Sequence, residues 1–216
     1  MIVEQIMTKN VHTLSPESTV KSALTLMRQH KIRHLPLSNE NEEVVGLVTE
    51  RDIKSTLPSF LKGEALEEHL HAPLSTIMNC NVITGHPLDF VEEIAALFYD
   101  HKIGCLPIVN NRKLVGIITS TDLLHTMVEL TGANKPGSQL EVRVKNRPGA
   151  LYEVTAVFHK HLVNVHSVLI YPDPDDEDYQ ILVFRIATIN PIPVIDALKK
   201  EDLHVLWPNM PGMSSS

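Results

Sequence analysis

A short pattern that occurs twice constrains this chain more than any other feature of its sequence. It consists of glycine, two apolar residues, threonine, two polar residues and aspartate, first at residues 46–52 and again seventy positions later at residues 116–122. The order is typical of a buried strand that turns into a helix, with threonine at the N-cap and aspartate in the first turn. One interpretation is helix capping, since Thr-x-x-Asp is close to the capping box and needs no ligand. The other is that two helix N-termini, each with a hydroxyl and a carboxylate, form a nucleotide site.

The duplication is much longer than this pattern. Residues 6–13 align with residues 77–84, and residues 30–37 with residues 101–108, both at an offset of 71. After the polar turns that follow, the offset becomes 70, so one residue is lost in a loop, where deletions are tolerated. Two copies of this period indicate a duplicated domain rather than a solenoid.

Each copy predicts the same series of elements: an extended piece, a proline turn, an amphipathic helix, a hairpin and the Thr-capped helix. The extended pieces are residues 11–13 and 82–84, and the amphipathic helices begin at Val20 and Val91. The hairpins pair residues 35–37 with 44–48, and residues 106–109 with 114–118. Residues 58–73 form a polar, helix-compatible linker between the copies.

This β-α-β-β-α order, with Pro36 and Pro107 opening a strand, resembles the CBS domain family, and two copies resemble a tandem CBS pair (Bateman module). The resemblance implies an α/β fold with the repeats packed about a pseudo-twofold axis. It also implies clefts that bind an adenosyl ligand: AMP, ADP, ATP or S-adenosylmethionine. The nucleotide-binding residues that it implies are Thr13, Ile32, Arg33, His34, Pro36, Thr49, Arg51, Asp52, Thr84, Gly104, Cys105, Pro107, Thr119, Ser120, Thr121 and Asp122.

The chemistry of the repeated pattern suits such a ligand, and the two copies differ in charge. A carboxylate can accept hydrogen bonds from both ribose hydroxyls, and a threonine hydroxyl with free helix N–H groups can hold a phosphate. The first copy carries Lys31, Arg33, Arg51 and Lys54 where the second carries Lys102, Gly104, Thr121 and His125. We therefore expect phosphate contacts to involve mainly the first copy, although a solvated cationic face is an equal alternative.

A polar stretch with two glycines and a proline, residues 131–138, marks a domain boundary. Beyond it the pattern predicts strand 140–144, a helix from about residue 150 to 161, strands 162–171 and 179–188 around an acidic turn, helix 191–200 and strand 203–206. This β-α-β-β-α-β order is ferredoxin-like, and the sequence at residues 146–151 resembles an ACT domain. The amino-acid site that this resemblance implies comprises Asn146, Gly149, Ala150, Leu151 and Asn164. The family commonly has Asp at the position of Asn146, so a ligand ammonium would lose a charge partner. For Gly149, a tight turn before the helix is the favoured alternative.

Composition excludes several classes of function. The net charge is −7, and both halves are acidic, which disfavours nucleic acid and anionic membranes as partners. No apolar run approaches a membrane span, and the N-terminus lacks the cationic start of a signal peptide. Cys80 and Cys105 are expected to be reduced thiols of a cytoplasmic protein. The histidine pairs 69/71 and 159/161 have no third ligand, so no metal is expected, and no catalytic signature occurs.

The sequence therefore predicts CBS domains at 1–60 and 74–131, linkers at 61–73 and 132–138, an ACT-like domain at 139–208 and a disordered tail at 209–216. The predicted function is that of a non-catalytic sensor without a catalytic cofactor, in which the ACT-like domain dimerises the chain or senses an amino acid. The domain order resembles acetoin-utilisation regulatory proteins of the B type. A ligand-free interaction scaffold, or a regulatory subunit of a separate enzyme or transporter, is the alternative.

Overall fold

The computed structural model describes residues 1–56 and 64–208, and the chain divides into two compact units, Met1–Leu124 and His125 onward. The division falls inside helix α5 (Ser120–Thr131). The predicted disordered tail and part of the predicted linker lie outside the described residues. Among those described, no helix is both long and apolar enough to cross a membrane.

The first repeat has the predicted helices and hairpin. Its elements are α1 (Val20–His30), β1 (His34–Ser38), β2 (Val44–Thr49) and α2 (Glu50–Thr56). Thr19 caps α1 by accepting a hydrogen bond from the Ser22 N–H at 3.2 Å, and Lys31 ends the helix in the left-handed region with φ 54°. The helix turns its apolar face to the antiparallel hairpin, where Ala23, Leu35 and Val48 are fully buried.

The second repeat is built in the same way. Its elements are α4 (Val91–His101), β3 (Cys105–Asn110), β4 (Lys113–Thr119) and the start of α5. Lys102, equivalent to Lys31, ends α4 with φ 53°. The predicted extended pieces at residues 11–13 and 82–84 are not regular strands. Each copy makes only a single parallel bridge just beyond them, Leu14 to Leu37 and Gly85 to Ile108.

The segment that leads into each repeat packs in the other repeat. The 3-10 helix η1 (Val3–Gln5) places Val3 in the core of the second repeat, and Val3 N–H donates to the Asp89 carbonyl at 3.0 Å. After α3 (Glu64–His71), the equivalent η2 (Leu74–Thr76) places Leu74 in the core of the first repeat. Both side chains are fully buried. The core of each repeat therefore contains a side chain from the segment that leads into the other repeat.

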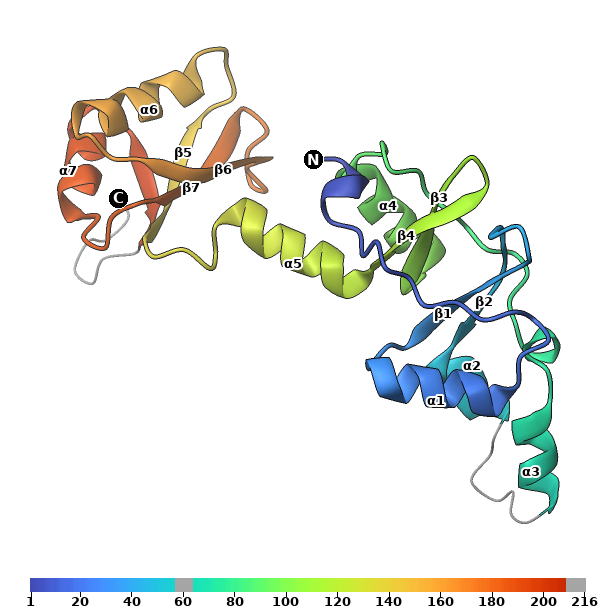
Figure 1. Ribbon diagram of the computed structural model, residues 1–216. Coiled ribbons are helices and arrows are strands. Elements are labelled where there is room, and N and C mark those ends of the chain that lie inside the picture. The colour runs from blue at the N-terminus through green and yellow to red at the C-terminus, as the bar shows by residue number, and fades with distance from the viewer. Residues whose placement is uncertain (57–63, 209–216) are drawn as a thin grey trace. The chain divides into compact units, whose positions relative to one another are not determined.

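The second unit contains the predicted ferredoxin-like order, with four antiparallel strands arranged β6-β7-β5-β8. Its elements after α5 are β5 (Ser138–Lys145), α6 (Ala150–Lys160), β6 (Val165–Pro172), β7 (Tyr179–Ile186), α7 (Ile192–Lys200) and β8 (His204–Trp207). Helices α6 and α7 cover one face of the sheet (Figure 1). Phe158 and Phe184 meet edge to face in this core, with ring centroids 4.8 Å apart.

The acidic turn between β6 and β7 is held by Arg143 of β5. Its Nε donates to Asp173, its Nη2 donates to Asp176 at 3.3 Å, and its guanidinium lies 3.8 Å from the Tyr179 ring centroid. The bond from Arg143, with that from the Asp175 N–H, lowers the pKa of Asp173. The turn is thereby fixed to the sheet.

Candidate functional site

The two Thr-x-x-Asp turns adopt the same geometry at the ends of β2 and β4. In the first repeat, the Asp52 Oδ2 accepts from the Thr49 N–H at 2.8 Å and from the Thr49 hydroxyl at 2.7 Å. The Asp52 N–H donates to the Thr49 Oγ1 at 3.2 Å. In the second, the distances for Thr119 and Asp122 are 2.8, 2.6 and 3.4 Å. Both turns are therefore capping boxes, as the first interpretation predicted. In the first repeat these bonds use one oxygen of the Asp52 carboxylate, so capping and ligand binding are compatible there.

His34 connects the first turn to the second repeat. It lies opposite Thr49 in the hairpin, and it is near enough to Asp52 for that carboxylate to raise its pKa. Burial and Arg33 outweigh Asp52, so the pKa of His34 is lowered overall. A Cβ on Gly104 would lie 3.0 Å from the His34 Nε2, so the glycine allows this close approach. Two predicted site residues from different repeats thus lie side by side.

A cavity of about 190 Å³ opens beside His34, where the repeats meet. The first repeat contributes His30, Ile32 and His34, and strand β4 of the second contributes Ile117. The segment before α1 supplies the remaining lining, Thr8, Asn10, Val11 and His12. The rings of His12 and His30 lie 3.7 Å apart between centroids. The wall is thus a mixture of imidazole, amide, hydroxyl and aliphatic groups.

Prediction from the sequence identified only part of this lining. Ile32 and His34 were predicted, whereas Asn10, His12 and His30 were missed. The copies differ at residue 12, since His12 aligns with Ile83. That difference could have identified the histidine.

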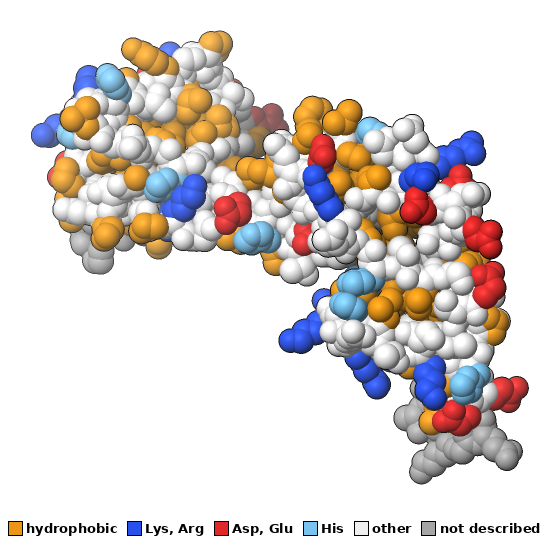
Figure 2. Space-filling view, viewed as in Figure 1, with side chains coloured by type: hydrophobic (Ala, Val, Ile, Leu, Met, Phe, Trp, Pro, Cys, Tyr) orange, Lys and Arg blue, Asp and Glu red, His pale blue; other side chains and the backbone are white. Residues whose placement is uncertain are grey.

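The cations of the first copy do not line the cavity beside His34. Lys31, Arg33 and Lys54 line a separate cavity of about 350 Å³ between α1 and α2, and Figure 2 shows Lys and Arg side chains over this part of the first repeat. Arg51 is exposed and lines neither of these two cavities. The offset of 70 also makes Leu124, not His125, the counterpart of Lys54, because Thr49 and Thr119 occupy equivalent positions at the strand ends.

Several predicted site residues line neither of the two cavities. Pro36, Pro107 and Cys105 are buried in the hairpin strands, and burial raises the pKa of the Cys105 thiol to about 12. Ser120 donates its hydroxyl to the Gly104 carbonyl at 3.3 Å. The remaining three, Thr13, Thr84 and Thr121, line neither cavity.

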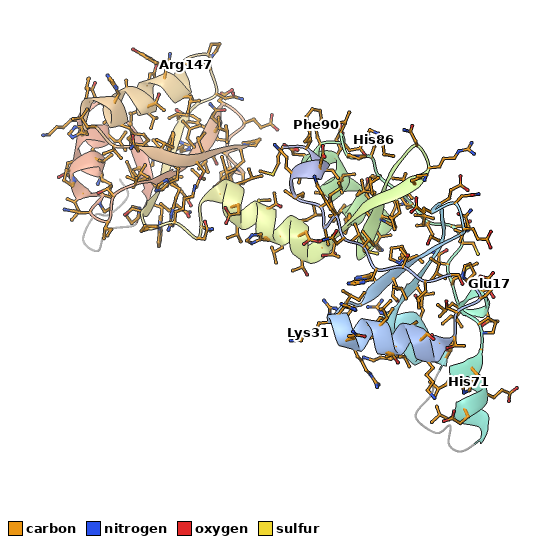
Figure 3. The ribbon with its side chains drawn as sticks, viewed as in Figure 1. Glu17, Lys31, His71, His86, Phe90 and Arg147 are labelled. Atoms are coloured by element: carbon orange, nitrogen blue, oxygen red, sulfur yellow. The ribbon has the colours of Figure 1, made fainter. Side chains whose placement is uncertain are left out.

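The predicted amino-acid loop follows β5 in the second unit. Asn146 is exposed and its N–H donates to the Asp178 carbonyl at 2.8 Å, so the loop is tied to the acidic turn. Gly149 has φ 89° at the start of α6, where it forms the tight turn that was the alternative interpretation. Ala150 is buried, while Leu151 and Asn164 are exposed. Arg147, which projects from this loop, pairs with Glu153 at 2.7 Å (Figure 3).

The described residues contain no cluster of three or more His, Cys, Asp or Glu side chains that could hold a metal ion.

Comparison with family models identifies both parts of the chain. The CBS domain model matches residues 3–59 and 74–129, and the ACT domain model matches residues 138–202. A CBS domain-containing protein of Bacillus subtilis, YhcV, is 34% identical over 56% of this chain and 81% of its own length. A homoserine O-acetyltransferase of Methanococcus vannielii is 32% identical, but the match spans only 25% of that enzyme.

Solved structures resemble the first unit. A proposed acetoin utilization protein (AcuB) of Vibrio cholerae is 33% identical over 63% of this chain and 98% of its own, with a TM-score of 0.54. The CBS domain pair of protein MJ0100, solved with 5′-methylthioadenosine and S-adenosylmethionine, is 28% identical over 62% and 98%, with a TM-score of 0.53. CBSX2, solved with AMP, is 25% identical over 59% and 96%, with a TM-score of 0.51.

Proposed function

Because this chain belongs to the CBS domain family and carries an ACT domain after its CBS pair, we propose that it is a non-catalytic regulatory sensor of an adenosyl ligand. The ligand is AMP, ADP, ATP or S-adenosylmethionine, and it binds between the repeats. The position of His34 carries the proposal. This one side chain lines the cavity between the repeats, neighbours the Thr49–Asp52 turn and contacts Gly104 of the second repeat.

The cavity suits the base of such a ligand better than the whole molecule. Its volume, about 190 Å³, is below the range of about 300–1,000 Å³ that is usual for complete small-molecule sites. The ribose and phosphates would then extend toward a Thr-x-x-Asp turn. Ligand-bound CBS pairs among the similar structures support the adenosyl class.

A thermal-shift panel of AMP, ATP, S-adenosylmethionine and amino acids tests this function. A ligand present at a hundred times its Kd stabilises the folded state by about 2.7 kcal/mol. An adenosyl ligand should therefore raise the melting temperature measurably. The absence of a shift with every compound would favour an interaction scaffold.

Two conservative variants separate capping from ligand binding. Glutamate is the usual capping-box partner at this position, so Asp52→Glu and Asp122→Glu should keep the helices while misplacing the carboxylate. We expect at least one of them to weaken binding by about tenfold, equivalent to about 1.4 kcal/mol. Unchanged affinity in both variants would place the ligand away from the turns.

The ACT domain supplies the dimer contact in this proposal. Strand β6 is an edge strand, and its residues Val168, Leu169, Ile170 and Tyr171 are 40–49% exposed. An exposed apolar edge favours pairing with a second copy. Leu169→Lys should therefore convert a dimer to a monomer in sedimentation velocity experiments, whereas Leu162→Lys, at an 89% exposed turn position, should not. A dimer that survives Leu169→Lys would place the contact elsewhere.

Similarity to the Vibrio cholerae protein supports acetoin utilisation as the physiological setting. Growth of a deletion strain on acetoin tests it, and normal growth would count against this role.

A further inference from the structure

We infer that the first CBS repeat holds a second ligand site, specific for an organic phosphate with an apolar or aromatic body, in the cavity between α1 and α2. This cavity lies within residues 24–54 and has a volume of about 350 Å³, which falls within the usual range for small-molecule sites of about 300–1,000 Å³. It is distinct from the cavity at the meeting of the repeats, with which it shares Ile32 alone.

The charges around this cavity are strongly unbalanced. Four cations, Arg28, Lys31, Arg33 and Lys54, face it together with one carboxylate, Glu50. Lys54 is paired with Glu50 at 2.7 Å. The other three make no ion pair with any residue that the structure describes. In a chain of net charge −7, this excess of three positive charges is a local exception.

Three of these cations lie close enough to Glu50 to lower its pKa. Its pKa is lowered by Lys54 first, and then by Arg33 and Arg28. Residues from the last turn of α1, from the segment just before β1 and from α2 therefore all act on the Glu50 carboxylate. Lys31 lies at the C-terminal end of α1 (Figure 3), where its left-handed backbone turns the chain toward β1.

The floor of the cavity is apolar, which defines the rest of the ligand. Met27 is 3% exposed and Ile53 is fully buried, with Leu24 and Ile32 half-buried beside them. An inorganic ion would leave this floor without a partner. A guanidinium is suited to phosphate because it can donate two parallel hydrogen bonds, and the aliphatic floor suits an attached ring or chain.

The second repeat provides an internal comparison. The positions equivalent to Arg28, Arg33 and Lys54 are Tyr99, Gly104 and Leu124, and only Lys102 remains as a cation. Tyr99 and Leu124 are 84% and 66% exposed. A general requirement of the CBS fold would have kept these charges in both copies. Their restriction to one copy indicates a role in binding.

Phenyl phosphate is a suitable probe, compared with inorganic phosphate and phenol at fixed ionic strength on the full chain labelled at Met and Ile methyl groups. We expect phenyl phosphate to shift the Met27 and Ile53 signals saturably, and to bind more tightly than either fragment alone. Equal binding of phenol, or shifts centred on Ile117 instead, would overturn the inference.

Matched lysine variants provide the control. Lys31→Gln should weaken phenyl phosphate binding by about fivefold, since a charge-assisted contact at an exposed site contributes about 1 kcal/mol. Lys102→Gln, at the equivalent left-handed position in the second repeat, should leave it unchanged. The double variant Arg28→Gln/Lys31→Gln should lose more than tenfold in affinity. Equal effects of Lys31→Gln and Lys102→Gln would indicate a nonspecific charge effect and reject the site.

The test is independent of the adenosyl proposal. If no adenosyl ligand binds, the phenyl phosphate titration still reports on this cavity. If AMP binds, saturating AMP should leave phenyl phosphate binding unchanged. Competition between the two would show that this cavity belongs to the nucleotide site and would overturn the inference.

Discussion

The first and second CBS repeats are built from the same series of elements but differ in the surfaces that they present. Each contains a helix, a hairpin and a Thr-capped helix, and each ends its first helix at a lysine in the left-handed region. Around that lysine, the first repeat has three further cations and the second has an exposed tyrosine and an exposed leucine. Because the fold is kept while the charge is not, the fold itself does not require these cations.

Removing a side chain that a leading segment places in the core of the other repeat should have the largest effect on stability. Leu74→Ala should lower the free energy of unfolding by about 3 kcal/mol, because it leaves a cavity in a closed core. The damage should appear in the first repeat, where Leu74 packs. Amide hydrogen exchange should therefore show faster exchange in α1 and β1 than in α4 and β3.

The equivalent change, Val3→Ala, is the matched control. It removes a smaller side chain from the core of the second repeat, so we expect a loss of about 2 kcal/mol with the opposite pattern of exchange. Faster amide hydrogen exchange in the second repeat of Leu74→Ala would contradict the packing of Leu74 in the core of the first repeat.

Two glycines provide a second test of this packing, because each faces a methionine from the segment that leads into the other repeat. A Cβ at Gly116 would overlap the Met7 Sδ, and one at Gly46 would lie 2.7 Å from the Met78 Sδ. Because methionine is flexible, each Gly→Ala change should cost only about 1–2 kcal/mol in urea unfolding.

A double variant localises the cause. If the Met7 side chain is responsible, Met7→Ala should reduce the cost of Gly116→Ala, and Met78→Ala should not. Additive effects of Met7→Ala and Gly116→Ala would mean that the contact is not the source of the cost.

The pH dependence of His34 gives the smallest expected effect. Its pKa is lowered below its ordinary value of 6.5, mainly by burial and then by Arg33, against an opposing effect of Asp52. The unfolded chain thus binds this proton more tightly, so the contribution to stability is present above pH 6.5 and is lost as the pH falls through the folded pKa.

His34→Gln should flatten this part of the stability curve, measured as urea midpoints between pH 5 and 7.5 in buffers of matched ionic strength. The second repeat has buried Cys105 at the equivalent position, and its thiol stays protonated in this range because its pKa is about 12. Cys105→Ser should therefore leave the slope unchanged. An unchanged slope in His34→Gln would assign the pH dependence to another group.

The sequence by itself determined the helices, the hairpins and their order. The amphipathic spacing from Val20 and from Val91 predicted helices that the structure contains, and the turn at residues 46–52 predicted both a strand end and a capped helix. These features are local, because periodicity, turn chemistry and capping depend on residues within a few positions of one another. The duplication and the ferredoxin-like order followed from the same local patterns.

Tertiary structure alone decided which residues meet. It placed Val3 and Leu74 in exchanged cores, brought His12 and His30 together beside His34, and gathered Arg28, Lys31 and Arg33 around one cavity. It also showed that the predicted extended pieces make single bridges instead of strands. These contacts depend on packing between segments that are distant in the chain. The repeated Thr-x-x-Asp turn is defined by local sequence, whereas the cavities beside it exist only in the folded chain.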